Sequence, residues 1–469
     1  MNRVPFYLLV DFNCFTFGLA SAVPSNSLLL FTSKNTTLDR VMTTTEASLM
    51  ASLTCLGGFL STPLTGFLLD YLGRKKCIML ASLMGVISWA LLVFTNKVAT
   101  VLVADFILGF TGSVFLIVPV YVGELSQNSI RGTLASGTVV FNGIGALTTF
   151  VLGEFLEYKT ITYIGLTLAT LALVLLSFLK ESPTLLMKKG LEDEAAKAMA
   201  FYRNSKPDSK VVVQEIDNIR RALAPEAQEM TPEEQKLVAE FGKTSAEKPS
   251  MWQFFKKSRS TQRALFLTLT IMAGAILQGF MTIQMYAIQL FSEAVPREVL
   301  SPNWCSALFL ALSVGVGLVA GYLTDVTGRR TLLIYSGISA GICAATLGSQ
   351  IQFHWGPQWV TALFIYLFCI TYTFGSGTVP FLLMAELFLP EVRGIMSMIC
   401  VEWNWVITFL SLFAFNPLVS ALGLGAVFYF FSSVAFGTAA FAFFCLPETN
   451  GLTVDAIQRL LVKKKDEKA

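Results

Sequence analysis

The sequence predicts an all-α membrane protein in which twelve transmembrane helices form two six-helix halves related by duplication. The 469-residue chain is 54% hydrophobic and only 14% charged, with a mean hydropathy of +0.63. A soluble domain carries about 25% charged residues, and a soluble helical protein would need polar helix faces that are missing here. The apolar residues gather in twelve long runs, and one set of charged motifs occurs twice in the same order, which indicates an internal duplication.

Most of the apolar runs have about the 20 residues that a helix needs to cross a bilayer. They cover residues 5–31, 47–69, 77–95, 98–123, 133–156 and 160–179, then 264–291, 304–324, 331–351, 358–385, 395–421 and 424–446. Lipid offers the backbone no hydrogen-bond partner, so each run should be a helix. We therefore expect an N-terminal half over 1–183 and a C-terminal half over 264–446.

A long polar interval separates the two halves. We expect a cytoplasmic helical linker over 184–263, in which 192–202 and 211–220 have the periodicity of short amphipathic helices. Residues 447–469 should form a cytoplasmic tail. The first ten residues lack the ordered features of a cleavable signal peptide, so the first apolar run should remain as an anchor.

The basic residues predict the orientation. Of the 34 Lys and Arg residues, all but Lys34, Arg40, Lys97, Lys159 and Arg297 fall on the cytoplasmic side when both termini are placed there. The long linker has little weight in this rule, but the short loops alone give the same result. The sequon that begins at Asn35 then lies outside, where it can be glycosylated. We expect a multi-pass protein of the plasma membrane.

The duplicated motifs stand at the cytoplasmic ends of the runs. Asp70, Gly73 and Arg74 recur as Asp325, Gly328 and Arg329, and each motif continues with a further basic residue. The other repeated residues are Glu124 with Arg131, matched by Glu386 with Arg393, and Glu181-Ser-Pro, matched by Glu448-Thr-Asn. Together these motifs resemble the sugar porter family of major facilitator transporters, in particular the insect trehalose and glucose facilitators.

The resemblance covers nearly the whole chain and implies the major facilitator fold, with facilitative transport of a sugar (trehalose or hexose) by alternating access.

The charged residues could be exposed ion pairs, each worth about 0–1 kcal/mol. Because they recur symmetrically, we favour a cytoplasmic gate that latches the halves together while the cavity faces outside. This gate consists of Asp70, Arg74, Glu124, Arg131, Glu181, Asp325, Arg329, Arg330, Glu386, Arg393 and Glu448. The family usually has an arginine in the fourth helix, and here no basic residue lies between Lys97 and Arg131.

The positions that bind sugar in the family are mostly changed in this chain. Val139, Ala275, Ile276 and Met281 stand where the family has amides, and none of their side chains can bond to a hydroxyl. Ser313, Thr373 and Phe381 replace an asparagine, a polar or acidic residue and a tryptophan. The asparagine of the eleventh helix is kept as Asn404.

New polar residues appear close to the changed positions. Asn142 and Gln278 each lie three residues beyond a lost amide, on the same helix face, and Thr282 follows on the face of Gln278. These groups could instead form interhelical hydrogen bonds. We expect a sugar site near the bilayer midplane, made of Asn142, Gln278, Thr282, Ser313, Thr373, Phe381 and Asn404.

Three acidic residues, Asp11, Asp105 and Glu402, lie within the apolar runs, where charge is costly and marks a functional suspect. The proton-coupling aspartate of the family would fall near Ala20, so that site should be missing.

Enzyme chemistry is not expected. The Gly-x-Ser-x-Gly match at 337–341 lies inside an apolar run, and the one histidine, His354, lies in an outer loop. The eight cysteines have no metal-binding or disulfide spacing, so we expect no cofactor and no metal. A net charge of +3 gives no reason to expect a nucleic-acid partner. Two alternatives stay open: a non-transporting sugar sensor, and a transporter of a less polar solute.

Overall fold

The computed structural model describes residues 4–125, 131–223, 258–295, 300–388, 390–452, 456–457 and 460. All regular elements in these ranges are α-helices, and twelve spans are long and apolar enough to cross a membrane. This confirms the prediction of an all-α protein with twelve transmembrane helices. The spans agree with the twelve apolar runs of the sequence to within a few residues at most of their ends.

The chain forms two compact units. The first comprises Met1–Ala227, Thr282–Ala311 and Leu412–Pro417. Its helices are α1 (Val4–Ser21), α2 (Val23–Phe31), α3 (Thr44–Tyr71), α4 (Arg74–Phe94), α5 (Val98–Thr111), α6 (Val114–Leu125), α7 (Arg131–Phe155), α8 (Tyr158–Ser177), α9 (Pro183–Lys188), α10 (Glu192–Arg203), α11 (Lys210–Leu223), most of α15 (Phe280–Met285), and α16 (Ala287–Ala294).

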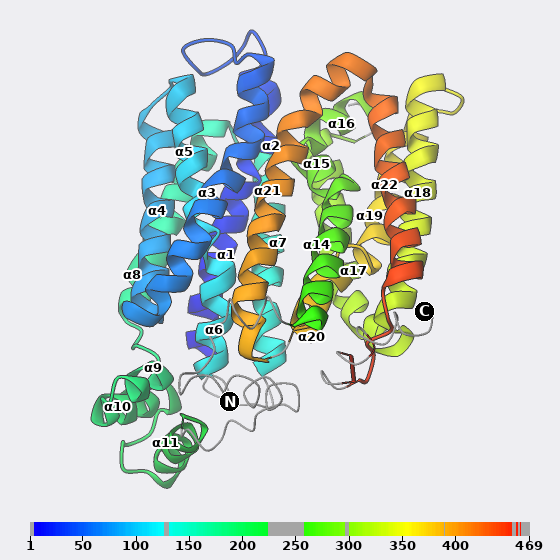
Figure 1. Cartoon of the computed structure of the whole chain (residues 1–469). Helices are drawn as coiled ribbons and strands as arrows, with labels where there is room; N and C mark the ends of the chain where they lie inside the picture. Colours follow the sequence, from blue (N-terminus) through cyan, green and yellow to red (C-terminus); the bar gives the residue numbers. More distant parts are fainter. Residues whose placement is uncertain are drawn as a thin grey trace. The chain divides into compact units, whose positions relative to one another are not determined.

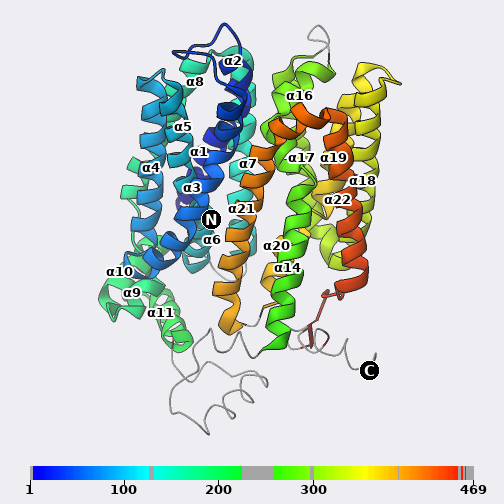
Figure 2. The same ribbon diagram turned by 45° about the horizontal axis from the view of Figure 1, so that its top comes forward.

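The second unit comprises Gln228–Met281, Leu312–Ser411 and Leu418–Ala469. It holds α14 (Arg259–Leu277), α18 (Arg329–Phe353), α19 (Gln358–Phe374), α20 (Val379–Glu386) and α22 (Leu424–Cys445), with most of α17 (Pro302–Thr327) and of α21 (Pro390–Leu422). In this unit α18 packs against both α19 and α22, and α14 contacts α20 and α22 (Figure 2). The division into halves at residues 183 and 264 stays a prediction.

Glycines let helices of the first unit approach closely. A Cβ added to Gly18 of α1 would lie 2.0 Å from the backbone oxygen of Asn142 on α7. A Cβ on Gly57 of α3 would lie 2.1 Å from the backbone oxygen of Phe106 on α5. No larger residue fits at either position without separating the helices, so these glycines fix the pairs α1–α7 and α3–α5.

Every third transmembrane span is interrupted. The first, fourth, seventh and tenth spans each consist of two helices, namely α1–α2, α5–α6, α14–α15 and α19–α20. The interruptions lie at Ala22, Gly112–Ser113, Gln278–Gly279 and Gly375–Thr378. Discontinuous helices expose backbone groups inside the membrane, and in transporters they typically form the binding site. A break in every third span also indicates a three-helix repeat within each half.

The helices of the linker form a small cluster beyond the ends of α6 and α8 (Figure 1). Both helices predicted in this interval are present, as α10 and α11. Their apolar faces pack together around Leu186, Met199, Val212 and Ile216. A buried core of its own lets the linker act as a folded element of the first unit.

The linker cluster is joined to the transmembrane helices of the same unit by polar contacts. Tyr202 bonds to the hydroxyl of Tyr121 on α6 at 3.0 Å and contacts the backbone of Lys180. Arg203 donates from Nη1 to the carbonyl of Leu125 at 3.1 Å and pairs with Glu215 at 2.8 Å. These contacts fix α10 and α11 to the end of the fourth span.

Candidate functional site

The break between α14 and α15 places an amide in a buried position. Gln278 is the residue after α14, and Gly279 follows with a φ of +90°, a conformation that favours glycine. The Gln278 side chain is fully buried, and neither its Nε2 nor its Oε1 has a hydrogen-bond partner among the described residues. A buried amide without a partner is costly, which sets Gln278 apart from the buried polar groups that are hydrogen-bonded.

The break between α19 and α20 lies in the same unit. Tyr372, in the last turn of α19, stacks on Phe280 with ring centroids 4.7 Å apart. Phe280 begins α15, so this stack links the break of the tenth span to the break of the seventh. The aromatic pair therefore helps to fix the chain that directly follows Gln278.

The other predicted site residues of the second unit differ in their surroundings. Asn404 is partly exposed. Phe381 is half exposed. Thr373 is buried and donates to the carbonyl of Cys369 in its own helix at 2.7 Å, while Ser313 lies beside Cys369. The exposed parts of Asn404 and Phe381 could therefore contact a bound molecule, whereas the hydroxyl of Thr373 already bonds within its own helix.

The first unit holds the remaining predicted residues. The Oδ1 of Asn142 is buried and lacks a partner among the residues described, although the residue as a whole is partly exposed. Thr282 is fully buried. Val139, at a position where the family has an amide, is 67% exposed. The structure tests none of the site assignments, which stay predictions.

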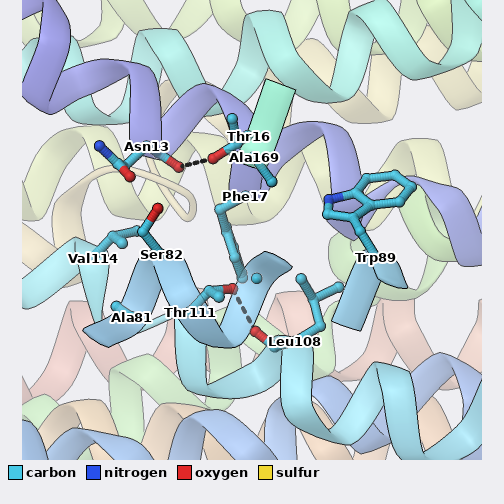
Figure 3. Close-up of a pocket in the computed structure, with 11 residues that line it drawn as sticks. Asn13, Thr16, Phe17, Ala81, Ser82, Trp89, Leu108, Thr111, Val114 and Ala169 are labelled. Atoms are coloured by element: carbon cyan, nitrogen blue, oxygen red, sulfur yellow. Dashed lines mark hydrogen bonds between the residues drawn. The ribbon is translucent and has the colours of Figure 1, made fainter. Parts of the chain in front are cut away.

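A small cavity lies within the first unit (Figure 3). Its volume of about 10 Å³ has room for one water molecule and none for a sugar. Asn13 and Ser82 point toward each other in this cavity, and the Oδ1 of Asn13 has no partner in the described part of the chain. The rest of the lining is mostly apolar. This cavity is therefore not a solute site.

All three acidic residues that lie within the apolar runs have at least one buried carboxyl oxygen. Asp11 and Asp105 are buried in the first unit, and each has one carboxyl oxygen without a partner among the described residues. Both oxygens of Glu402 on α21 are buried in the same way. Asp11 faces Gly137 of α7, where an added Cβ would lie 2.7 Å from its Oδ2.

The duplicated charged motif of the first unit forms one network. Arg74, with only 6% of its side chain exposed, donates from Nη2 to Glu124 at 2.7 Å. Glu181 accepts from the backbone N–H groups of Arg74 and Lys75 and thereby caps the start of α4. Ser182 donates to the other oxygen of Glu124. Asp70 is 3.6 Å from Arg74 and exposed to solvent.

The second unit repeats this network residue by residue. Arg329 donates to Glu386 at 2.9 Å, Glu448 accepts from the N–H groups of Arg329 and Arg330, and Thr449 donates to Glu386 at 2.7 Å. Asp325 again is exposed and lies 3.1 Å from the arginine. Asn450 adds a bond between its Oδ1 and Nη1 of Arg329 that has no counterpart in the first unit, where Pro183 follows the serine.

The side chains of two other predicted gate residues contact backbone carbonyls. Arg330 donates to the carbonyl of Phe443 and lies over its ring, and Arg393 contacts the carbonyl of Phe388 at 3.3 Å. The side chain of Arg131 lies outside the described residues. Every ion pair in the two networks joins residues of one unit, and the gate between halves stays a prediction.

Comparison with known proteins identifies the family. The model of the family described as "Sugar (and other) transporter" matches residues 8–461, which is nearly the whole chain. The chain belongs to this family.

Relatives within the family include proteins from mosquitoes. The chain is 28% identical over 459 residues to the facilitated trehalose transporter Tret1 of Culex quinquefasciatus, covering 96% of this chain and 84% of that protein. It is 27% identical over 462 residues to Tret1 of Aedes aegypti, covering 97% of this chain. The chain spans only 54% of the length of the Aedes protein.

Solved structures of other proteins share the fold of this chain. The inward open conformation of the xylose transporter XylE from E. coli superposes with a TM-score of 0.75 at 18% identity, covering 97% of this chain and 99% of XylE. XylE bound to 6-bromo-6-deoxy-D-glucose, described as a major facilitator superfamily protein, gives a TM-score of 0.69 over 97% of this chain. The fold is therefore the major facilitator fold.

Proposed function

We propose that this protein is a facilitative transporter of a sugar, either trehalose or a hexose, that works by alternating access. The family membership supports a transporter, and the names of the insect relatives support trehalose as a substrate. The broken spans support a solute site near the middle of the membrane. The protein acts without a catalytic centre.

One observation carries the choice of a hydroxylated solute, namely the unpaired amide of Gln278. An amide presents two donors and one acceptor group, which suits neighbouring hydroxyls of a sugar. Asn142 and Asn404 offer the same chemistry, and the exposed ring of Phe381 suits the apolar face of a sugar. We propose these four residues, with Thr282, Ser313 and Thr373, as the binding residues.

A less polar solute is the second candidate. Val139 and Met281 are exposed at positions where the family has amides, and neither can bond to a hydroxyl. A solute with fewer hydroxyls would suit these side chains better. A non-transporting sensor would bind a sugar but would show no flux.

Uptake into proteoliposomes tests these functions. Purified protein should carry radiolabelled trehalose or glucose down its gradient, with saturation, and an excess of the unlabelled sugar should compete. Binding of either sugar without flux would favour the sensor. Saturable flux of an apolar glycoside, with neither binding nor flux of the two sugars, would favour the less polar solute.

The variant Gln278→Leu tests the site itself. Leucine fills a similar volume and removes the unpaired amide, so the variant should unfold at the same or a higher temperature. Loss of one hydrogen bond to a buried hydroxyl should raise KM about 5- to 150-fold. The control is Gln352→Leu, at an exposed position in the last turn of α18, which should leave KM unchanged. An unchanged KM in Gln278→Leu would mean that this amide does not bind the solute.

We further propose that the protein resides in the plasma membrane with both termini in the cytoplasm. The distribution of Lys and Arg supports this orientation, and Asn35 lies exposed in the loop between α2 and α3. Glycosylation of Asn35 would follow from it.

A further inference from the structure

The break of the tenth span is fastened to a neighbouring helix by one side chain. The backbone N–H groups of Gly375 and Gly377 donate to the backbone carbonyl of Tyr372. Those of Thr378 and Val379 donate to the backbone carbonyl of Gly375. Only the N–H of Ser376 bonds outside the segment, to Oγ of Ser336 on α18 at 3.0 Å.

The bond between Ser376 and Ser336 is buried. Ser336 and Ser376 are both almost fully inaccessible, so water cannot replace the bond. The hydroxyl hydrogen of Ser336 is directed to the carbonyl of Leu333 at 3.1 Å, which leaves a lone pair for the N–H of Ser376. Their hydroxyls also approach to 3.4 Å. The geometry therefore makes Ser336 the acceptor of the one N–H that the break cannot satisfy itself.

The close approach of the two segments restricts the residue at 375. A Cβ on Gly375 would lie 2.2 Å from Oγ of Ser336 and 2.6 Å from the carbonyl oxygen of Leu332. Only glycine fits, so the break is seated directly on α18.

The break holds residues of the proposed site on both sides. Thr373 precedes it, Phe381 follows it, and Tyr372 stacks on Phe280 beside Gln278. A shift of the break would move the aromatic stack and the wall of the solute site. We propose that Ser336, which touches no solute, is a positioning residue for transport because it fixes the bend of the tenth span. The kinetic test of this proposal rests on the proposed transport function, whereas the hydrogen–deuterium exchange test does not.

The chain offers a matched control on the same helix. Ser432 of α22 donates to the carbonyl of Gly341 on α18 at 2.7 Å, in a bond that is also buried. Ser432→Ala removes a buried bond of α18 without touching the break. A role in stability alone predicts the same behaviour for Ser336→Ala and Ser432→Ala.

Hydrogen–deuterium exchange tests the bond independently of transport. Exchange in the peptide that contains residues 375–378 should be roughly tenfold faster in Ser336→Ala than in wild type, because a buried N–H has lost its acceptor. Ser432→Ala should exchange there like wild type, and Ser336→Thr, which keeps the hydroxyl, should restore slow exchange. Wild-type exchange in Ser336→Ala would overturn the proposal.

Uptake kinetics test the consequence for transport. With the radiolabelled sugar that wild type carries, trehalose or glucose, Ser336→Ala should raise KM at least about fivefold. Ser432→Ala should keep the wild-type KM even if it unfolds at a lower temperature. Equal KM changes in both alanine variants would overturn the positioning role. If wild type carries neither sugar, the proposed function fails, while the exchange measurement still decides the role of Ser336.

Discussion

Asn416 on α21 donates from Nδ2 to the hydroxyl of Ser48 on α3 at 3.1 Å, although the two residues lie in opposite halves of the sequence. The same amide contacts the hydroxyl of Tyr286 at 3.3 Å, and the ring of Tyr286 packs on Phe415 with centroids 4.6 Å apart. All four residues belong to the first compact unit. Ser48 and Tyr286 are buried, so these bonds replace contacts with water.

Loss of the Asn416 amide should loosen this cluster. Asn416→Ala leaves the hydroxyls of Ser48 and Tyr286 without that partner, at a cost of about 1–3 kcal/mol. In an alternating carrier this favours states in which the cluster is open. Ala22 is buried in the same apolar cluster as Ile288, which lies two residues after Tyr286. In a Cys445→Ser background, the thiol introduced by Ala22→Cys should therefore react about 5- to 150-fold faster with an impermeant maleimide.

The control for this measurement is Ser52→Ala. Ser52 lies one turn after Ser48, and among the described residues its hydroxyl bonds to the carbonyls of Ser48 and Leu49 in α3. If the thiol introduced by Ala22→Cys is labelled equally with and without Asn416→Ala, the cluster does not restrain access.

Asn35 should be glycosylated in a eukaryotic host. The residue is exposed in the loop between α2 and α3, and Thr37 of the sequon is exposed too. Glycosidase treatment should increase the mobility of the protein on a gel, and Asn35→Gln should abolish the change. A wild-type band that does not respond to the enzyme would argue against the proposed orientation.

The sequence was sufficient to predict the spans and to identify which charged residues recur in the two motifs. Long apolar runs of this kind form helices in lipid. A motif that occurs twice in the sequence is expected to adopt the same local structure in both places. The spacing grouped Glu124 with Arg131 and Glu386 with Arg393, whereas in the structure Glu124 pairs with Arg74 and Glu386 with Arg329. The partners of Arg330 and Arg393 are backbone carbonyls, which have no sequence signal.

The interruptions of the spans were not predicted, because hydropathy does not change where a helix breaks inside an apolar run. The Gly375-Ser-Gly377 stretch was a signal that could have located one of them. No signal linked Ser336 to Ser376, or Asn416 to Ser48, since these contacts depend on packing between distant segments. Gln278 was predicted for its polarity, and its place in a break came only from the structure.

The attachment of the linker should depend on pH in the alkaline range. Burial raises the pKa of the Tyr202 hydroxyl to about 12, although its bonds to Tyr121 and Lys180 act in the opposite direction. A phenol has an ordinary pKa of about 10. The docked state therefore binds the proton more tightly, and its stability is complete below a pH of about 10 and is lost as pH rises toward about 12.

Tyr202→Phe tests this dependence. The variant keeps the ring and its contact with Phe6 but cannot ionise. Its unfolding temperature should be lower than that of wild type at neutral pH, and the difference should shrink above a pH of about 10. A constant difference across this range would assign the effect to packing. Tyr163→Phe, at an exposed position, is the control.

The two acids that face Arg329 should differ in their effect on stability. Glu386 is only 25% exposed and accepts bonds from Arg329 and Thr449, whereas Asp325 is 71% exposed. Glu386→Gln should therefore lower the free energy of unfolding by about 1.5–3 kcal/mol, as expected for bonds to a charged group. Asp325→Asn should change it by about 0–1 kcal/mol. Thermal unfolding in detergent would measure both.

The gate hypothesis adds a second expectation for the same residue. If the charged networks hold the cytoplasmic side closed, Glu386→Gln should favour inward-facing states, so labelling of a cysteine in the outer cavity should fall. Arg393→Ala should act in the same direction, while Asp325→Asn should label like wild type. A stability loss in Glu386→Gln with unchanged labelling would mean that the network supports the fold of its own unit and does not regulate access.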